Sequence, residues 1–288
     1  MNDKSSGGGC GIAVLMLVHK DKNQAQRLID HLSKDFAVFV HIDKRSRLKI
    51  RCSENVFIFK KYKSYHGSFN LTMAALFLLQ AAFKIGYDRY ILISAQDLPV
   101  VSNTDIINFF KNNNHEYLEL KKIPTPEGWP PMDRLISYYP NNFIRNNDRP
   151  FYIFLFRCQR KLLYIYSKIR PRQIDGDFYG GSQWTNYTHA CVEKIFQYLK
   201  NNKKIINRFK WTHCSDEIFF QTIIRQITGL AIIHDNLRYI DWDNGPESPR
   251  ILRKEDYDKI IRSNSLFARK FDPAVDNDII EQIYRKIE

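Results

Sequence analysis

The sequence has few cysteines, and they follow no recognisable pattern. Five occur among 288 residues, and none belongs to a C-x-x-C pair. An odd number of cysteines at long spacings indicates neither a disulfide framework nor a structural zinc site. We therefore expect reduced thiols and a protein of the cytoplasm.

Long hydrophobic runs are also lacking. The longest apolar run near the N-terminus covers residues 12–18, whereas a helix that spans a bilayer needs about 20 such residues. We find no signal peptide and no transmembrane helix in the sequence. Residues 1–10 are polar and rich in glycine, so we expect this N-terminus to be disordered.

Acidic residues are outnumbered by basic ones. The 31 Asp and Glu against 44 Lys and Arg give a net charge of +13 at pH 7. This charge predicts an anionic partner: nucleic acid, a phosphorylated ligand or an acidic membrane surface. The basic residues are spread along the chain, and no helix-turn-helix, zinc-finger or RNA-recognition motif is present, so we expect no nucleic-acid partner.

Strands and helices are expected to alternate through residue 120. The continuous apolar run at 12–18 is typical of a strand that is buried on both faces. The other expected elements are strands at 36–42, 56–59 and 89–94 and helices at 21–32, 68–83 and 103–111. This order predicts an α/β fold with a parallel sheet and crossover helices. Ligands bind such sheets at the carboxyl ends of the strands.

The second half of the chain begins irregularly. Six prolines between 121 and 150 predict a loop region. The next segment, 151–170, is rich in aromatic and basic residues. Further along we expect strands at 180–184 and 231–234 and helices near 188–201, 215–227 and 254–262.

The residues that could carry chemistry lie in the last third. Ser215-Asp216-Glu217 opens an apolar stretch, and Arg250 and Lys270 follow it. One carboxylate and two separated cations match a sugar-transfer site that needs a base and holds a diphosphate without a metal. Taken singly, these residues have plainer interpretations, which are an acidic helix N-terminus and solvated cations near a helix end.

A metal-binding Asp-x-Asp motif is lacking where a nucleotide-sugar enzyme usually carries it. That place, just after Ile93, has Asp97 as its single carboxylate. Asp-x-Asp tripeptides do occur elsewhere, at 175–177, 241–243 and 256–258. We expect no metal cofactor, although a weak metal role for Asp241 and Asp243 stays open.

Seven short motifs follow one another in a characteristic order. They are His41-Ile42-Asp43-Lys44-Arg45, Tyr65-His66-Gly67-Ser68, Gln96-Asp97-Leu98-Pro99, Gly181-Ser182-x-Trp184, Ser215-Asp216-Glu217, Ser248-Pro249-Arg250 and Leu266-Phe267-Ala268-Arg269-Lys270-Phe271-Asp272. The series resembles the core-2/I-branching β-1,6-N-acetylglucosaminyltransferases and their relatives, the peptide O-xylosyltransferases, over roughly residues 11–285.

The resemblance implies one GT-A glycosyltransferase domain over residues 11–288. Its nucleotide-binding, Rossmann-like part would be 11–120, and its acceptor-binding and catalytic part 121–288. The implied reaction is inverting transfer from a UDP-sugar without a metal.

The resemblance also implies roles for single residues. Glu217 would be the general base that deprotonates the acceptor hydroxyl. Arg250 and Lys270 would meet the diphosphate, with Arg253 as an alternative to Arg250. Asp43 would accept from N3–H of uracil.

Other residues would line the two substrates. Val18 and His19 would line the uracil, and Gly67, Ser68 and Asp97 would lie along the donor pocket, where a glycine permits close approach of the backbone. Ser182 and Trp184 would meet the acceptor. The alternative for Trp184 is a core tryptophan.

Residues 151–170 mix aromatic, aliphatic and basic side chains. We expect an interfacial helix drawn to anionic lipid. The alternative is a half-buried helix whose basic face is solvated or lines the acceptor groove.

The chain lacks the transmembrane anchor and the many cysteines of the family's animal members. We therefore expect a bacterial-type cytoplasmic enzyme, peripheral on the inner face of the membrane. It would add N-acetylglucosamine or xylose to a glycan or lipid-linked glycan of a surface polysaccharide or lipopolysaccharide. The rival from another class is a non-catalytic basic module that binds membranes.

Overall fold

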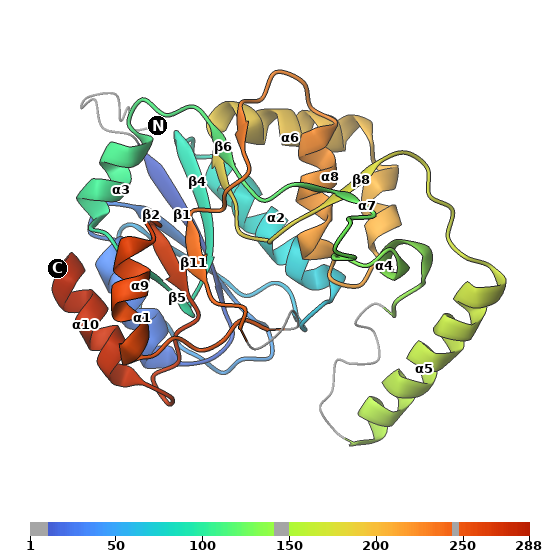
Figure 1. Cartoon of the computed structure of the whole chain (residues 1–288), viewed down its shortest axis with the longest axis horizontal. Coiled ribbons are helices and arrows are strands. Elements are labelled where there is room, and N and C mark those ends of the chain that lie inside the picture. Colours follow the sequence, from blue (N-terminus) through green and yellow to red (C-terminus); the bar gives the residue numbers. More distant parts are fainter. Residues whose placement is uncertain (1–10, 141–149, 244–247) are drawn as a thin grey trace.

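A computed structural model describes residues 11–140, 150–243 and 248–288 (Figure 1). The disorder that we expect of residues 1–10 lies outside these ranges. Within them, the largest sheet has seven strands in the order β10-β6-β9-β4-β1-β2-β3. Their bounds are β1 Ile12–Val18, β2 Ala37–Ile42, β3 Val56–Phe59, β4 Arg89–Ser94, β6 Glu116–Tyr117, β9 Asn186–Thr188 and β10 Ile232–Ile233.

The first half of the chain forms the parallel part of this sheet, as predicted. Strands β4, β1, β2 and β3 pair in parallel. Helices α1 (Lys22–Leu32) and α2 (Phe69–Phe83) lie between them in the chain, and α3 (Asn103–Phe110) follows them. Beyond β4 the sheet is mixed, because β9 runs antiparallel to both β4 and β6. The expected α/β class is confirmed.

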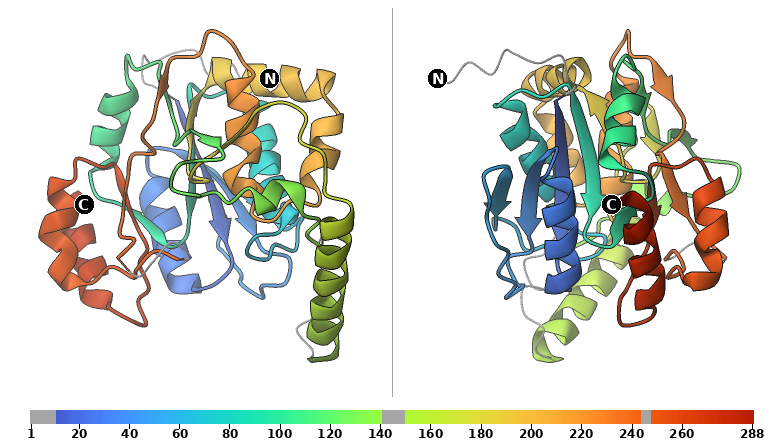
Figure 2. Two further views of the ribbon diagram at one scale, coloured as in Figure 1. Left: turned by 45° about the vertical axis from the view of Figure 1, so that its right-hand side comes forward. Right: turned by 90° about the vertical axis from the view of Figure 1, so that its left-hand side faces the viewer.

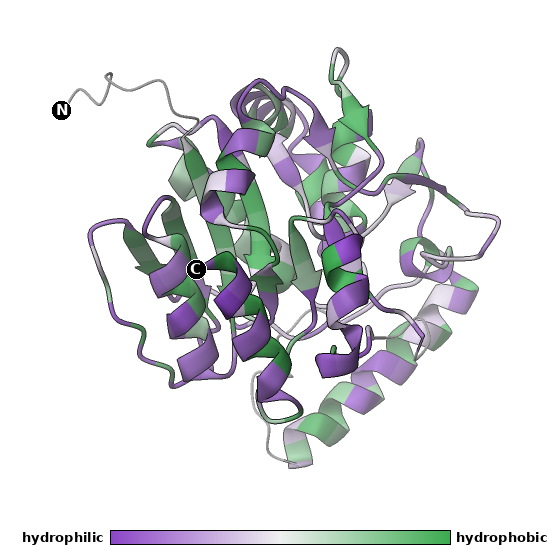
Figure 3. Cartoon of the chain, turned by 60° about the vertical axis from the view of Figure 1, so that its left-hand side comes forward, coloured by the Kyte–Doolittle hydropathy of each residue, from purple (hydrophilic) through white to green (hydrophobic). Residues whose placement is uncertain are grey.

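Every residue of β1 is buried, because both faces of the sheet are covered (Figures 2 and 3). Val14 and Met16 belong to one core cluster, which includes residues of α1 and α10, whereas Leu15 belongs to the other, with residues of α2, α6 and α8. The α-helices described after residue 180 are α6 His189–Asn201, α7 Lys204–Phe209, α8 Phe219–Arg225, α9 Tyr257–Arg262 and α10 Asn277–Ile287.

A smaller sheet connects the C-terminal part of the chain to the first half. It has the order β11-β12-β5, with bounds β11 Arg238–Ile240, β12 Phe267–Arg269 and β5 Asp97–Pro99. Strand β12 runs antiparallel to β5, so that Arg269 lies opposite Asp97. Two motifs that are far apart in the sequence are therefore neighbours.

Three of the expected elements differ in the structure. The expected strand at 180–184 is wrong, because β8 (Phe178–Gly180) pairs with β7 (Lys121–Ile123) and then gives way to a loop before β9. The expected helices at 215–227 and 254–262 are each divided. A 3-10 turn, η1 at Ser215–Glu217 or η2 at Lys254–Asp256, precedes the α-helical part.

The proline-rich region leads into a long helix on the periphery. It contains the one-turn helix α4 (Asp133–Ile136), and α5 (Pro150–Ile169) follows. Figures 1 and 2 show that α5 projects from the body of the protein. None of the helices in the described ranges combines the length and the apolar character needed to cross a bilayer.

Candidate active site

The predicted uracil-binding residues lie together where β1 and β2 end. Val18 is buried, and its carbonyl accepts from the backbone N–H of Asp43 at 2.8 Å. His19 follows directly and is exposed. This pairing of strand ends places Asp43, which is buried, at the carboxyl end of the sheet, where the topology predicts a ligand.

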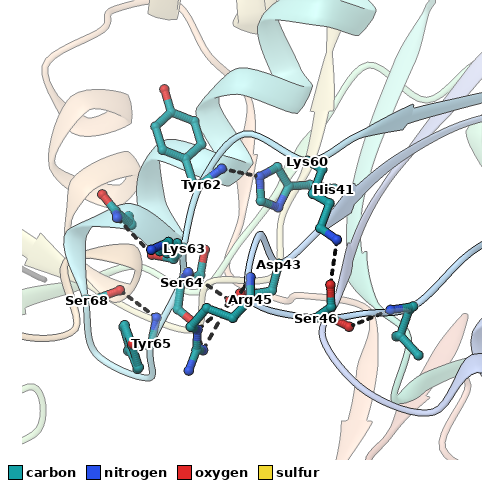
Figure 4. A network of polar contacts seen from close by, with 12 residues as sticks. His41, Asp43, Arg45, Ser46, Lys60, Tyr62, Lys63, Ser64, Tyr65 and Ser68 are labelled. Carbon is teal, nitrogen blue, oxygen red and sulfur yellow. Dashed lines mark hydrogen bonds and ion pairs between the residues drawn. The ribbon is translucent and has the colours of Figure 1, made fainter. Parts of the chain in front are cut away.

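Asp43 is at the centre of a polar network (Figure 4). Its Oδ1 accepts from the backbone N–H of Arg45 at 2.8 Å and from Nε of the same residue at 3.1 Å. Its Oδ2 accepts from Nη2 of Arg45 at 3.2 Å and from the backbone N–H of Ser64 at 2.8 Å. The guanidinium of Arg45 lies 3.6 Å from the centre of the Tyr65 ring. Both carboxylate oxygens are thus held in place by protein donors.

Gly67 and Ser68 serve the protein's own packing in this structure. Ser68 Oγ accepts from the backbone N–H of Tyr65 at 3.0 Å, in the turn before α2. Gly67 has a φ of +72°, and a Cβ there would lie 2.4 Å from Nε2 of His213. The close approach that we expect at this glycine is therefore made by His213. The Gly67 carbonyl accepts from the backbone N–H of Cys214 at 2.9 Å.

Glu217 ends the 3-10 turn that follows Cys214. Its carboxylate accepts from Nη1 of Arg134 at 2.5 Å, and 24% of its side chain is exposed. Arg134 comes from α4, in the region that the sequence shows only as a proline-rich loop. The Glu217 carbonyl accepts from the backbone N–H of Gly181 at 2.9 Å. A carboxylate that is both fixed and partly open suits a base that must reach a substrate hydroxyl.

Asp216, the neighbour of Glu217, is buried, and its Oδ1 has no hydrogen-bond partner. Burial, and then the charge of Glu217, raises the pKa of Asp216 to about 7. Ser215 is also buried, and its Oγ lies 2.7 Å from Thr72 Oγ1 of α2. The turn is therefore fixed to the core on one side and presents Glu217 on the other.

Lys270 directly follows β12 and is half-buried. Its Nζ donates to Ser248 Oγ at 2.6 Å. Burial, and then the nearby cations Arg269 and Lys20, lowers the pKa of Lys270. Lys20, which follows His19, pairs with Asp272 at 2.6 Å. This contact brings the Lys270 segment to the end of β1.

Arg250 is held by two carboxylates. Its Nη2 lies 2.5 Å from Asp241 and 2.6 Å from Asp256. The Asp241 carboxylate, which the sequence leaves open as a metal ligand, is thus engaged by a cation. Arg253 is exposed. Across the part of the chain that the structure describes, no group of three or more His, Cys, Asp or Glu is placed to hold a metal ion.

Asp97 is fully buried, so its carboxylate does not line an open pocket. It accepts from the backbone N–H of Ser94 at 2.6 Å and from Nη1 of Arg269 at 2.8 Å. Burial raises the pKa of Asp97 in spite of this partner. The Arg269 guanidinium lies 4.0 Å from the centre of the Trp184 ring.

Trp184 and Ser182, the expected acceptor residues, are both buried in the structure. Trp184 is 6% exposed and belongs to a core cluster. It is thus a core tryptophan, which is the alternative to a role in acceptor binding. Ser182 is fixed at its backbone N–H by Glu119 Oε2, at 3.1 Å.

One loop connects the expected uracil-binding and catalytic residues. At Ser64 it donates to Asp43, and at Gly67 it accepts from Cys214, three residues before Glu217. The structure thereby brings Asp43, the Glu217 turn and the Lys270 segment to one edge of the sheet. Sequence reasoning gives no role to Arg134, Arg45, Arg269 or Asp256, which hold these residues in position.

Comparisons with known proteins match the chain to one enzyme family and to two kinds of glycosyltransferase. A family model described as "Branch: Core-2/I-Branching enzyme" matches residues 12–261. The chain is similar to beta-glucuronosyltransferase GlcAT14B of Arabidopsis thaliana, with 25% identity over 209 residues, covering 69% of this chain and 45% of that protein. It is also similar to xylosyltransferase 1 of Rattus norvegicus, with 24% identity over 305 residues, covering 94% of this chain and 35% of that protein.

The chain therefore spans less than half the length of these two relatives. Among solved structures, the WbbM bifunctional glycosyltransferase in its apo form matches with a TM-score of 0.42 and 13% identity. That match covers 96% of this chain and 52% of the other.

Proposed function

Because its family model matches residues 12–261, the chain belongs to the core-2/I-branching enzyme family, and we propose that it is an inverting, metal-independent glycosyltransferase. It moves a sugar from a UDP-sugar to a hydroxyl of a glycan. The observation that carries this proposal is the loop that contacts Asp43 at Ser64 and the Glu217 turn at Gly67. It connects Asp43, the proposed uracil-binding residue whose carboxylate Arg45 and Ser64 hold in place, with Glu217, the proposed base.

In the proposed reaction Glu217 takes the proton of the acceptor hydroxyl. The hydroxyl oxygen then forms a bond to the anomeric carbon from the face opposite the nucleotide, as the bond between that carbon and the diphosphate oxygen breaks. The electron pair of the broken bond leaves with UDP. Arg134 holds the Glu217 carboxylate at 2.5 Å while leaving part of it exposed.

Lys270 would balance the charge that develops on the diphosphate. At about 4 Å and an effective dielectric constant of about 20, one unit-charge contact is worth roughly 4 kcal/mol. Arg250 would contribute less as a free cation, because Asp241 and Asp256 already neutralise it. Its structural contribution is to hold the segment whose Ser248 contacts Lys270.

The donor sugar would be N-acetylglucosamine or xylose. One relative is named a xylosyltransferase and another a glucuronosyltransferase. UDP-glucuronic acid is therefore also a donor worth testing. We place the enzyme in the cytoplasm, peripheral on the inner face of an anionic membrane. There it would act on a glycan or lipid-linked glycan of a bacterial surface polysaccharide or lipopolysaccharide.

Two other functions make different predictions. A metal-dependent transferase would use Asp241 and Asp243, but the bond from Arg250 to Asp241 counts against it. A non-catalytic basic module would bind membranes and no UDP-sugar.

A UDP-release assay over a panel of UDP-sugars, with and without EDTA, separates the three. We expect release from one donor that survives EDTA. Release that EDTA abolishes would favour the metal-dependent enzyme, and a protein that neither hydrolyses a donor nor binds UDP by calorimetry would favour the module.

A further inference from the structure

Helix α5 contacts the rest of the protein along one narrow face. Among its 20 residues, Phe156 and Ser167 are buried. Ser167 Oγ accepts from the backbone N–H of Tyr138 at 2.8 Å and donates to the Leu163 carbonyl at 2.6 Å. In the described parts of the chain, most of the other residues of α5 are exposed.

The face opposite these contacts is apolar. Six residues follow one another at intervals of three or four, and this spacing places them on one side of a helix. Five are large hydrophobic residues that are exposed, from 47% at Ile165 to 74% at Ile169, and the sixth is an exposed cysteine. This apolar stripe consists of Phe151, Phe154, Cys158, Leu162, Ile165 and Ile169.

A row of cations runs beside the apolar stripe. Arg157, Lys161 and Lys168 each precede a residue of the stripe by one position, so they lie along one flank of it. All three are exposed. Residues 150–174 contain no aspartate and no glutamate. An exposed apolar stripe with a purely cationic flank complements an anionic lipid surface. A second copy of the chain would instead bring like charges together.

We propose that α5 docks on an anionic bilayer, with the apolar stripe among the upper acyl chains and the cationic flank on the headgroups. The segments that fix α5 also support the Glu217 turn. The Ile136 carbonyl of α4 accepts from the backbone N–H of Arg172 at 2.8 Å, and Thr212 Oγ1 accepts from Nη1 of Arg172 at 3.0 Å. Docking therefore keeps the catalytic turn near the membrane, so that the acceptor is a membrane-borne glycan. This last step rests on the proposed function.

Vesicle co-sedimentation of the whole chain tests the docking surface. The vesicles are phosphatidylcholine alone or phosphatidylcholine with phosphatidylglycerol, in about 0.1 M salt, where the Debye length is about 10 Å. One variant changes three residues of the stripe to serine without altering the charge, and the other changes the three cations to glutamine. The substitutions are Phe154→Ser, Leu162→Ser and Ile165→Ser in the first variant and Arg157→Gln, Lys161→Gln and Lys168→Gln in the second.

Two control variants match these changes in number and type at exposed sites elsewhere. The apolar control is Ile85→Ser, Ile233→Ser and Val275→Ser, and the charge control is Lys200→Gln, Lys203→Gln and Lys204→Gln. We expect the wild type to bind the vesicles that contain phosphatidylglycerol and not those of pure phosphatidylcholine. The cation variant should bind about 100-fold more weakly, at about fivefold for each Lys or Arg near the surface. The stripe variant should lose at least about tenfold, the value of burying one large aliphatic side chain. Both controls should bind like the wild type.

Wild-type binding by the stripe variant would overturn the proposal. So would sedimentation velocity that shows a dimer of the wild type and a monomer of the stripe variant without lipid, because the stripe would then bind a second copy. UDP release from a soluble donor, measured on the same preparations, keeps the two proposals apart. If the wild type releases no UDP, the proposed transferase activity is contradicted. If the stripe and cation variants bind vesicles as the wild type does, only the proposed docking of α5 is contradicted.

Discussion

Arg134 and Glu217 form an ion pair of 2.5 Å between two short helical turns that are far apart in the sequence. Their side chains are 15% and 24% exposed, so the pair lies at the surface of the site without being fully solvated. In the proposed reaction, the acceptor hydroxyl would therefore reach the open part of a carboxylate whose orientation the guanidinium has already fixed.

Replacing Arg134 with methionine should lower the transfer rate by about 10- to 100-fold, because a base that is free to rotate loses part of its positioning. The measurement is kcat for transfer together with UDP affinity, which should stay unchanged. Arg262→Met removes an exposed arginine elsewhere and is the matched control. A wild-type kcat for Arg134→Met would show that the ion pair has no part in the reaction.

Loss of Lys270 should affect the step in which UDP leaves. Lys270→Ala should reduce the rate by about 10²–10³-fold, the usual cost of deleting one preorganised charge-stabilising donor. Steady-state UDP release gives this value, with Lys200→Ala, an exposed lysine on α6, as the control. An unchanged rate would remove Lys270 from the diphosphate site.

Arg250 and Arg253 should differ chiefly in their effect on stability. Arg250→Ala leaves the carboxylates of Asp241 and Asp256 buried without their cation, which should lower the free energy of unfolding by about 3 kcal/mol. Arg253 is exposed, so Arg253→Ala should change it by less than about 0.5 kcal/mol. Urea unfolding of the two variants checks this order, and equal losses would contradict the structural role of Arg250.

The buried Asp216 should make stability depend on pH. Its pKa is about 7 in the folded protein, against 3.8 ordinarily. Between these values the folded state holds the extra proton, so this residue lowers stability as pH rises, by at most about 1.4 kcal/mol per pH unit.

Asp216→Asn should remove that slope. The change that this substitution makes to the free energy of unfolding should therefore be more favourable at pH 8 than at pH 5. Urea unfolding at both pH values measures the difference, with the exposed Asp258→Asn as the control. An identical pH dependence of Asp216→Asn and the wild type would contradict this account.

Much of the parallel sheet could be predicted, because β1, β2 and β4 are apolar runs with clear boundaries. The turn at Ser215–Glu217 was harder, since its residues favour a helix start and the 3-10 geometry depends on Cys214, which has a φ of +48°. Helix α10 escaped prediction although it is amphipathic and packs Ile283 and Tyr284 into the core. The packing of β12 on β5 also depends on tertiary contacts that no local pattern contains.

The expected site residues could be chosen from motifs, but the partners that hold them could not. Arg134 lies in an irregular, proline-rich region, where neither periodicity nor a motif marks it. Asp97 and Trp184 are both buried and both contact Arg269, and these contacts become visible only once β5 and β12 are paired. Sequence patterns thus indicate the chemical types at the site, whereas the ion pairs that position them depend on the fold.

The most direct test of the account is the activity of Glu217→Gln measured beside its affinity for UDP. The substitution keeps the shape of the side chain and removes the base, so transfer should fall by about 10²–10⁴-fold while calorimetry shows UDP binding as in the wild type. Glu193→Gln, an exposed position on α6, controls for the substitution itself. Near-wild-type transfer by Glu217→Gln would contradict the central claim that Glu217 is the general base.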